Sequence, residues 1–382
     1  MMGKNHKILI QIGILIFSIL VFIPSAQAAP SVSSRYCCLV DSTTGQMIFS
    51  RGAEEIRPVA STTKMMTAIL AVEYCQLDEM ATVSEFADRT PEFTIGLRKG
   101  QVVSVEELLK VALLRSSNDA AVVLGEHIAG EERLFGHLMT RKAFLIGAYN
   151  THFVNASGLP ANDHYSTAYD IAQIGRYLLK KPYLSSLVAA QQAEFKHPDY
   201  QQALTIYNTN GLLSSYQGAD GIKTGTTDAA GKCLAASATR NGRQLIAVVL
   251  NSGDRYGDCR RLLDYGFLKT NLVTVLDGNT VFKEIKVLKG RNKESVALYP
   301  RDTVELWQGE GTPNIEKKVT LKYWLEAPIP QGQKVGRVDI YADGRFFQST
   351  DIICGQNVER ELNLIMRLLR DIFFQKTSKA PK

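Results

Sequence analysis

Apolar residues recur with helical spacing through much of this chain, and that spacing predicts its first structural elements. Stretches in which Gly, Pro and Asn recur separate the segments. We expect helices at residues 62–74, 105–130, 132–148, in a segment capped by Ser166 or Thr167, and at 260–269. The pattern therefore predicts a helical block in the first part of the chain and a closing helix after it.

Two β-rich regions flank this helical block. Residues 34–52 form two short runs around a Thr-Thr-Gly turn, and residues 233–253 form two runs around Asn241-Gly242, a strong hairpin signal. Hairpins on either side of a helical block can complete one antiparallel sheet. Residues 29–272 are therefore predicted to form an α+β domain, with helices packed on an antiparallel sheet.

The pattern of apolar and polar residues changes at about residue 273. Short alternating segments occur there, separated by Gly, Pro and Asn turns, at residues 280–290, 294–300, 302–307, 317–325 and 335–344. Alternation with period two is typical of strands with one buried face. Residues 273–356 are expected to form a small all-β domain.

In the segment 357–382 the spacing of apolar residues changes again, from the alternation of strands to the spacing of a helix. One face of the predicted helix is apolar and consists of Val358, Leu362, Ile365, Met366, Leu369, Ile372 and Phe373. Such a stripe either docks on the body of the protein or lies in the plane of a membrane surface. Additional apolar residues widen this face and lysines follow it, which favours the membrane. We expect residues 357–382 to hold the protein peripherally on a membrane.

The first 28 residues have the anatomy of a secretory signal peptide. Lys4 and Lys7 precede an uncharged apolar stretch at 8–23, which Pro24 and an Ala26-Gln27-Ala28 cleavage site follow. An uncleaved anchor helix is the alternative, but the stretch is short for a membrane span. We expect cleavage after Ala28, so that the mature protein functions outside the cytoplasm.

Composition narrows the function classes. Apolar residues make up 45% and charged residues 21% of the chain, which excludes wholesale disorder. Loss of residues 1–28 would lower the net charge from +6 to +4, too weak a bias for a nucleic-acid partner. The histidines form no H-E-x-x-H motif, so no metal or other cofactor is expected. The six cysteines lack C-x-x-C spacing, so we expect mostly buried free thiols, with one bridge possible.

Three short motifs occur once each. They are, in chain order, Ser61-x-x-Lys64, Ser116-x-Asn118 and Lys223-Thr224-Gly225. Each alone has an ordinary interpretation as a helix start, a polar turn between helices or a turn before a strand. All three in this order, on these elements, are the signature of the serine penicillin-recognising enzymes.

The residue types fit nucleophilic catalysis by a serine. A hydroxyl needs a base, and Lys64 lies one helical turn from Ser61, so the amine and the hydroxyl share a face. A lysine serves as a base when burial or a nearby cation lowers its pKa. Lys223, on a neighbouring strand, is expected to supply that second charge and to attract an anionic substrate.

The remaining motif residues complete a site for an extended substrate. Ser116 is expected to relay a proton to the leaving amine, and the Asn118 amide to bond a substrate carbonyl. Thr224 can donate to a carboxylate, while Gly225 lets the substrate lie close to the strand. The backbone amides of the nucleophile and of Thr226 are expected to form the oxyanion hole.

The sequence around the motifs resembles the D-alanyl-D-alanine carboxypeptidases, the low-molecular-mass penicillin-binding proteins of peptidase family S11. The segments that carry the resemblance include "ASTTKMMTA", "LLRSSNDAAVVLGEHIAG", "THFVNASGLP", "GADGIKTGTTDAAGKCLAASATRNGRQLIAVVLNS" and "RYGDCRRLLDYGF". The β domain and the amphipathic tail also match the usual architecture of that family. The resemblance implies a DD-peptidase/β-lactamase-like catalytic domain over residues 29–272.

The resemblance also implies the activity. It predicts removal of the terminal D-alanine from peptidoglycan pentapeptide stems through an acyl-enzyme on Ser61, and covalent inhibition by β-lactams. Arg255 matches an arginine that helps to hold the substrate carboxylate. Some relatives have His directly after K-T-G, where this chain has Thr226, which would alter the pH profile or the substrate preference.

Two other functions remain open on the sequence. A β-lactamase on the same scaffold would hydrolyse a chromogenic cephalosporin rapidly, but no Glu can be placed where it would activate the water. A wall-binding scaffold with a dead site is the non-enzymatic alternative, and the three intact motifs argue against it.

Overall fold

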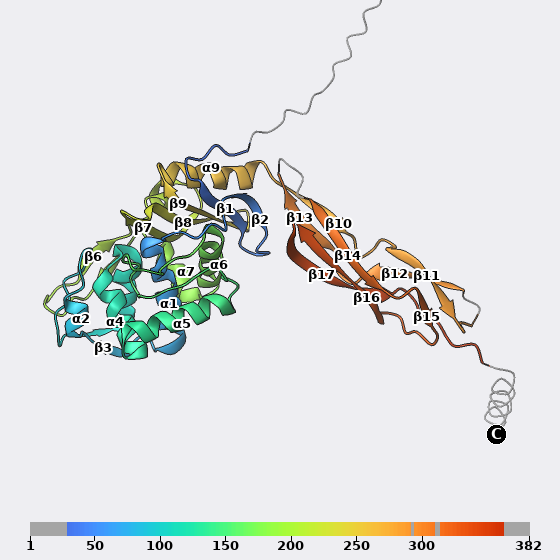
Figure 1. The fold of residues 1–382 in the computed structure, drawn as a ribbon, viewed down its shortest axis with the longest axis horizontal. Coiled ribbons are helices and arrows are strands. Elements are labelled where there is room, and N and C mark those ends of the chain that lie inside the picture. Colours follow the sequence, from blue (N-terminus) through green and yellow to red (C-terminus); the bar gives the residue numbers. More distant parts are fainter. Residues whose placement is uncertain (1–28, 292–293, 310–313, 363–382) are drawn as a thin grey trace, which may run out of the picture.

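The computed structural model describes residues 29–291, 294–309 and 314–362, which form two bodies joined end to end (Figure 1). The first body combines helices with a five-stranded sheet, and the second is built of strands. Helix α9 (Arg255–Leu268) ends the first body and strand β10 (Asn271–Leu276) begins the second. The predicted α+β domain followed by an all-β domain is confirmed.

The sheet of the first body is antiparallel and ordered β2-β1-β9-β8-β7. Its strands are β1 (Tyr36–Asp41), β2 (Met47–Arg51), β7 (Ala219–Thr227), β8 (Gly231–Arg240) and β9 (Arg243–Ser252). The N-terminal hairpin joins the later hairpin where Cys38 lies opposite Val248. Asn241 and Gly242 turn between β8 and β9 with φ of 50° and 78°, the positive values that a tight hairpin turn requires. The two predicted hairpins therefore do share one sheet.

The predicted helices begin and end close to their expected boundaries, with two differences, and the described part of the chain adds three short helices that the sequence did not predict. The segment 105–130 is interrupted at Ser116, and α9 begins at Arg255 rather than 260 because the Asp254 carboxylate caps it by accepting from the Gly257 amide. Thr167, of the two proposed caps, accepts from the Asp170 amide. The helical elements are the 3₁₀ turn η1 (Ala60–Thr63), α1 (Lys64–Tyr74), α2 (Glu85–Asp88), α3 (Val105–Lys110), the π turn η2 (Val111–Arg115), α4 (Asn118–Ala129), α5 (Glu132–Leu145), α6 (Ala168–Leu179), α7 (Pro182–Ala189) and α8 (Leu212–Ser215). Two small hairpins complete the body: β3 (Met80–Thr82) with β4 (Val102–Ser104), and β5 (Gln192–Phe195) with β6 (Leu204–Tyr207).

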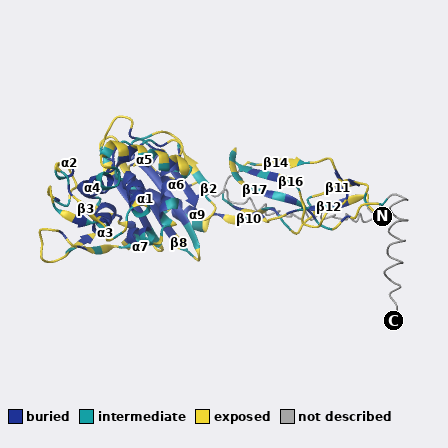
Figure 2. Cartoon of the chain, turned by 90° about the horizontal axis from the view of Figure 1, so that it is seen from below, coloured by how far each residue is buried: buried dark blue, intermediate teal, exposed yellow. Residues whose placement is uncertain are grey.

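The sheet lies between two apolar cores. Figure 2 shows that much of the sheet and of the helices around it is buried. On β9, Ile246 and Val248 pack into the core shared with the helical block, while Ala247 and Val249 pack into the core under α9. Successive side chains of a strand point to opposite faces, so a central strand covered on both sides is apolar throughout. This explains the continuous run "LIAVVL" (245–250).

The second body is an elongated β domain. Its strands after β10 are β11 (Lys283–Leu288), β12 (Ser295–Pro300), β13 (Val304–Gln308), β14 (Ile315–Leu321), β15 (Trp324–Glu326), β16 (Lys334–Ala342) and β17 (Arg345–Cys354). They form a sheet ordered β14-β16-β17-β12-β11-β15 and a ribbon of β10 with β13 around a core of their own. Val358, the first residue of the predicted amphipathic stripe, is buried in this core and pairs with Ile329. The rest of that stripe, apart from Leu362, lies outside the described residues.

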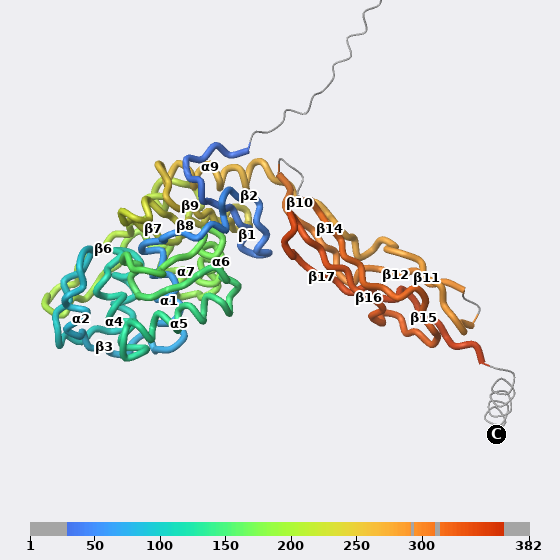
Figure 3. Tube along the Cα trace, viewed as in Figure 1, coloured from blue at the N-terminus to red at the C-terminus, as the bar shows by residue number. Residues whose placement is uncertain are grey.

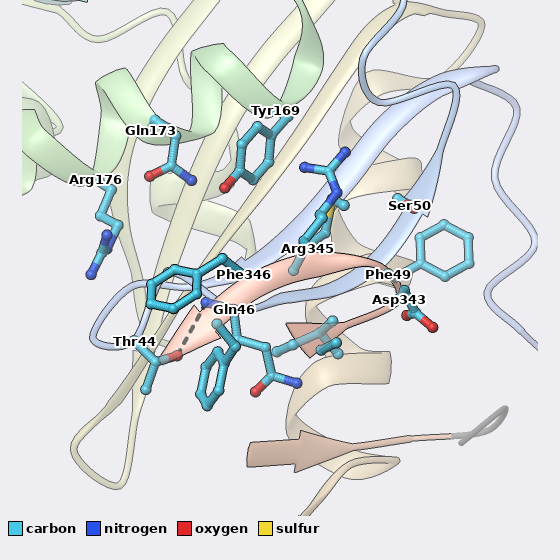
Figure 4. A pocket seen from close by; sticks show the side chains of 15 residues that line it. Thr44, Gln46, Phe49, Ser50, Tyr169, Gln173, Arg176, Asp343, Arg345 and Phe346 are labelled. Atoms are coloured by element: carbon cyan, nitrogen blue, oxygen red, sulfur yellow. Dashed lines mark hydrogen bonds between the residues drawn. The ribbon is translucent and has the colours of Figure 1, made fainter. Parts of the chain in front are cut away.

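The two bodies contact each other beside the β1–β2 hairpin. The Gln46 side chain donates to the Trp307 carbonyl at 2.6 Å and accepts from the Trp307 amide at 2.7 Å. Arg345 pairs with Glu54 and lies over the Tyr169 ring, 4.6 Å from its centroid. Between them lies a cavity lined by the β1–β2 hairpin, α6 and the β16–β17 turn (Figure 4). These contacts tie the first body to one end of the β domain.

All six cysteines lie in the described residues and are free thiols, five of them buried. The expectation of buried free thiols fits this arrangement, and the single bridge that the sequence left open does not form. No helix among residues 29–291, 294–309 and 314–362 is long and apolar enough to cross a bilayer.

Candidate active site

The first motif forms a tight turn that presents Ser61 at the start of α1. Ala60 has φ of 48°, and the Val59 carbonyl accepts from the amide and the hydroxyl of Thr62, at 3.3 and 2.6 Å. This turn leads directly into Lys64, the first residue of α1. Ser61 is partly exposed whereas Lys64 is buried. The serine hydroxyl is therefore open to a substrate while the amine beside it is shielded from water.

Three oxygen atoms surround the Lys64 amine. Its Nζ lies 3.0 Å from Ser61 Oγ, 2.6 Å from Asn118 Oδ1 and 2.7 Å from the Ser157 carbonyl oxygen. A neutral amine has two N–H groups and one lone pair. The amide and carbonyl oxygens can only accept, so they take the two hydrogens and leave the lone pair facing the Ser61 hydroxyl. In this geometry the amine can accept a proton from the Ser61 hydroxyl.

The electrostatic setting favours the neutral amine. Burial lowers the pKa of Lys64 well below its usual value, and the positive charge of Lys223 lowers it further, while Asp119 opposes the shift. The Asp119 carboxylate is itself held by the amides of Ile95, Gly96 and Leu97, at 3.1 to 3.2 Å, and by the Ser117 hydroxyl at 2.6 Å. Burial is the largest of these effects on the pKa of Lys64.

The second motif lies on the break between η2 and α4. Ser116 has φ of 69° and ψ of 31°, a left-handed conformation that ends the π turn and projects its hydroxyl toward β7. The Asn118 amide nitrogen donates to the Glu92 carbonyl at 3.0 Å, so its oxygen points at Lys64. The interruption of segment 105–130 therefore places both motif residues in the site.

The third motif lies within β7, not in a turn before a strand. Lys223 Nζ donates to Ser116 Oγ at 2.9 Å, and the Thr224 hydroxyl lies 2.7 Å from that of Thr209. A Cβ at Gly225 would lie 3.0 Å from the Ser61 amide nitrogen, so glycine lets the strand approach Ser61 without crowding it. β7 is the last strand of its sheet, which leaves its outer edge facing the site.

Arg255 attaches the start of α9 to the same strand. Its Nη1 donates to Thr226 Oγ1 at 2.8 Å and to the Gly225 carbonyl at 3.1 Å. Burial lowers the pKa of Lys223 to about 7, and the charge of Arg255 adds to this effect. The structure thus brings all nine predicted residues together, with Lys223 on β7, Arg255 bonded to the same strand and Lys64 at the start of α1.

Comparison with known proteins agrees with this geometry. The family model described as D-alanyl-D-alanine carboxypeptidase matches residues 23–254. The chain belongs to this family. A second model, penicillin-binding protein 5, C-terminal domain, matches residues 271–360 and so covers the β domain.

Similar proteins of this family match along most of their length. The D-alanyl-D-alanine carboxypeptidase DacC of Escherichia coli K12 is 32% identical over 88% of this chain and 89% of its own. DacF of Bacillus subtilis 168 is 29% identical over 84% and 85%. Penicillin-binding protein 5 of Haemophilus influenzae has a similar structure, with a TM-score of 0.69, 27% identity and coverage of 87% of this chain and 100% of its own.

Sequence reasoning missed the loop that completes the surroundings of Lys64. Residues 155–159 (Asn-Ala-Ser-Gly-Leu) supply the Ser157 carbonyl, and the Asn155 side chain holds the loop by accepting from the Gly158 amide at 2.7 Å and donating to the Leu159 carbonyl at 2.9 Å. A backbone carbonyl has no residue signature. The available signal was the "NASGLP" segment, whose Asn and Gly mark a specific turn.

His164 is a second residue that the sequence did not single out. Its Nδ1 accepts from the Val154 amide at 3.2 Å, so Nε2 carries the proton and donates to Thr63 Oγ1 at 2.9 Å. Burial lowers the pKa of His164 to about 4, and the charges of His152 and Lys64 contribute. A neutral His164 therefore anchors the turn that carries Ser61.

Gly158 offers a test of how tightly the nucleophile turn is positioned. Its φ is +84°, and a Cβ there would lie 2.0 Å from the Ala60 carbonyl oxygen. Gly158→Ala should therefore shift the Ala60–Ser61 turn and slow penicillin acylation by about 100-fold, the order expected when a reacting group moves by ~1 Å.

Gly147→Ala is the matched control. Gly147 has φ of +89°, but nothing lies within 4 Å of its Cβ position. Both variants should lose thermal stability from the strained backbone, while only Gly158→Ala should lose acylation rate, measured with a fluorescent penicillin. Equal acylation rates in the two variants would contradict this role of Gly158.

Proposed function

We propose that this protein removes the terminal D-alanine from peptidoglycan pentapeptide stems through a covalent intermediate on Ser61. The observation that carries the proposal is the Lys64 amine, whose two carbonyl-type partners leave its lone pair toward the Ser61 hydroxyl at 3.0 Å. Membership in the D-alanyl-D-alanine carboxypeptidase family supports the substrate. The edge of β7 supplies a surface along which an extended peptide can lie.

Acylation begins when the stem peptide lies along β7 with its terminal carboxylate near Lys223, Thr224 and Arg255. Ser61 Oγ attacks the carbonyl carbon of the penultimate D-alanine and gives its proton to Lys64. The backbone amides of Ser61 and Thr226 stabilise the oxyanion. The C–N bond to the terminal D-alanine then breaks, and its amine takes up the proton through Ser116.

Deacylation returns the enzyme to its starting state. A water molecule adds to the acyl carbon and gives a proton to Lys64, and Ser61 leaves with a proton restored to its oxygen. The products are D-alanine and a tetrapeptide stem. Penicillin acylates the same oxygen by opening of its β-lactam ring, which leaves a stable adduct.

Mass spectrometry of the protein with a pentapeptide stem tests the whole proposal. The expected result is loss of one D-alanine from the peptide, together with a penicilloyl adduct that maps to Ser61. Rapid turnover of a chromogenic cephalosporin with no peptide cleavage would identify a β-lactamase instead. Failure of both reactions would indicate a wall-binding scaffold with an inactive site.

The two lysines predict a bell-shaped pH dependence of kcat/KM for carboxylate substrates. Acylation needs neutral Lys64, so the rate should rise with pH until Lys64 loses its proton, which happens well below the usual lysine pKa. Substrate capture needs charged Lys223, whose pKa of about 7 means that the free enzyme loses this charge as pH rises through neutrality. kcat/KM should therefore decline on the alkaline side.

Substitutions of Lys223 separate the two limbs of that profile. Lys223→Arg should remove the alkaline decline, because a guanidinium stays charged. Lys223→Ala should lower kcat/KM by roughly 10- to 100-fold through loss of a charge-assisted hydrogen bond. It should also move the acid limb to higher pH, because Lys64 no longer has a positive neighbour. An unchanged rate and pH profile in Lys223→Ala would contradict both roles.

We also propose the domain limits and the cellular place of the protein. Residues 1–28 would direct export and be removed, 29–272 would form the catalytic domain and 273–356 the β domain. The second body itself begins with β10 at Asn271 and includes Val358 in its core. Residues 357–382 would hold the exported enzyme on the outer side of the cytoplasmic membrane, through the apolar stripe of the segment beyond the described residues. Peptidoglycan lies on that side, which agrees with the proposed substrate.

A further inference from the structure

A patch of exposed aromatic and apolar side chains lies at the start of strand β15, just before it and on its neighbour β11. Tyr323 is 90% exposed and Trp324 57% exposed, although both are large apolar residues that a monomer usually covers. Leu288, on the adjacent strand, is also exposed. Lys322 precedes the aromatic pair. We call Leu288, Lys322, Tyr323 and Trp324 the tip patch.

The tip patch occupies the end of the molecule that is farthest from the catalytic body. β15 is the last strand of its sheet, and Figures 1 and 3 show it at the far end of the β domain. The active site lies in the other body, so this patch has no part in the chemistry proposed above. Exposure alone does not distinguish the tip patch, because Phe144 and Tyr149 in the other body are similarly exposed, so its place in the molecule is what sets it apart.

The chain leaves the described structure beside the same patch. Arg360 forms a bridge with Gly290, and the Glu361 amide donates to the Lys289 carbonyl at 2.7 Å, directly after β11. The remaining 20 residues, 363–382, therefore start at the tip. Their sequence carries most of the apolar stripe that we propose to lie in a membrane surface.

The charges around the tip patch suit an anionic surface. Glu326, the acidic residue of β15, pairs with Lys289 at 2.7 Å and with Arg360 at 3.7 Å. Lys286, which lies opposite Trp324 in the sheet, and Lys322 form no ion pair among the described residues. Two lysines therefore remain available beside the aromatic pair, while the carboxylate is neutralised.

We propose that the tip patch is a lipid-binding surface that inserts Tyr323 and Trp324 into the interface of an anionic membrane. Tyr and Trp prefer this region because an apolar ring and a polar N–H or O–H meet water and lipid there together. Lys286 and Lys322 contact the lipid phosphates, as long basic side chains do at membrane surfaces.

This second contact orients the enzyme. A helix in the interface alone would leave the bodies free to tilt, whereas the tip and residues 363–382 together hold the β domain with its far end on the membrane. The catalytic body then stands away from the bilayer, on the side of the peptidoglycan. The proposal concerns attachment, and it stands whether or not Ser61 has the proposed activity.

Tryptophan fluorescence tests the proposal without altering the patch. The chain has two tryptophans, Trp307 and Trp324, so Trp307→Phe leaves Trp324 as the single reporter. The mature protein is mixed with vesicles of phosphatidylglycerol and phosphatidylcholine. The fluorescence emission of Trp324 should then shift to shorter wavelength, and lipids brominated near the headgroup should quench it. Trp324→Phe, which leaves Trp307 at the junction of the two bodies, should show neither effect.

Several outcomes would overturn the proposal. One is unchanged Trp324 emission while the protein sediments with the vesicles, which would leave residues 363–382 as the sole anchor. Another is a blue shift that depends on protein concentration without lipid, because it would identify a contact between two copies of the chain. Fluorescent penicillin labelling is recorded in parallel, so failure of the proposed enzymatic function appears separately.

A matched pair of substitutions adds a second test. Tyr323→Ser with Trp324→Ser should weaken vesicle binding about tenfold, since the two rings are the largest apolar contribution at the tip. The control is Phe144→Ser with Tyr149→Ser, an aromatic pair in the catalytic body that is 63% and 68% exposed. The control should bind like the parent protein. Equal losses in both double variants, or no loss at the tip, would contradict the proposal.

Discussion

Replacing Ser61 with alanine should abolish both covalent penicillin labelling and release of D-alanine. The nucleophilic oxygen is lost, and the Lys64 amine then has no hydroxyl to deprotonate. We expect a fall in turnover of about 10⁴-fold or more, the order found when a catalytic nucleophile is removed. Gel fluorescence with a labelled penicillin and mass analysis of a pentapeptide digest measure the two losses.

The fold should survive this change. Ser61 is partly exposed, and loss of its single hydrogen bond to Lys64 should change the free energy of unfolding by only about 1 kcal/mol. Ser116→Ala is the informative comparison, because it should slow the reaction but still allow labelling of Ser61. Labelling of Ser61→Ala at another serine would show that the nucleophile had been assigned to the wrong residue.

Lys64 should be the second most sensitive position. Lys64→Met keeps the length of the side chain but removes the amine, so acylation should slow by about 10²- to 10⁴-fold, the contribution of general base catalysis. Lys64→Arg should be as slow, since a guanidinium stays protonated and cannot take the serine proton. Pre-steady-state acylation with penicillin at several pH values measures both effects.

Loss of the Lys64 amine should also lower the stability of the protein, so a control for folding is needed. In Lys64→Met, Asn118 Oδ1 and the Ser157 carbonyl lose their donor, at a cost of about 1–3 kcal/mol for each buried group left unpaired. Lys142→Met is the control for loss of a lysine elsewhere. Lys142 pairs with Glu73 at 2.7 Å outside the site, so its removal should leave acylation unchanged. Near-normal acylation in either Lys64 variant would place the base at another residue.

Several features of the fold were predictable because their signals are local. The helices at α1, α5 and α6 follow from apolar periodicity and from caps such as Thr167. The turn between β8 and β9 follows from Asn241-Gly242, because few other residue pairs tolerate two positive φ values. The two small hairpins, β3–β4 and β5–β6, were missed because their strands have only three or four residues and no clear alternation.

The break at Ser116 shows where local signals end. The helical pattern of residues 105–130 allows a polar turn at Ser116-Ser117-Asn118, but it does not predict that Ser116 is left-handed or that it joins a π turn, η2, to α4. The contact of Ser116 with Lys223 joins residues 107 positions apart in the sequence. A long-range contact of this kind outweighs local propensity, which amounts to less than about 1 kcal/mol per residue.

The sequence by itself determined the three motifs of the candidate site and their order, but not the Ser157 loop or His164. Ser61 and Lys64 lie within one helical turn, so their proximity follows from covalent spacing, and the other two motifs are recognised by residue type. Only the tertiary structure decided what Lys64 can do. Its pKa depends on burial and on the charges of Lys223 and Asp119. One of its hydrogen-bond acceptors is the carbonyl of Ser157, 93 positions away. A backbone carbonyl has the same chemistry in every residue, so no sequence pattern marks the one that folding brings to the amine.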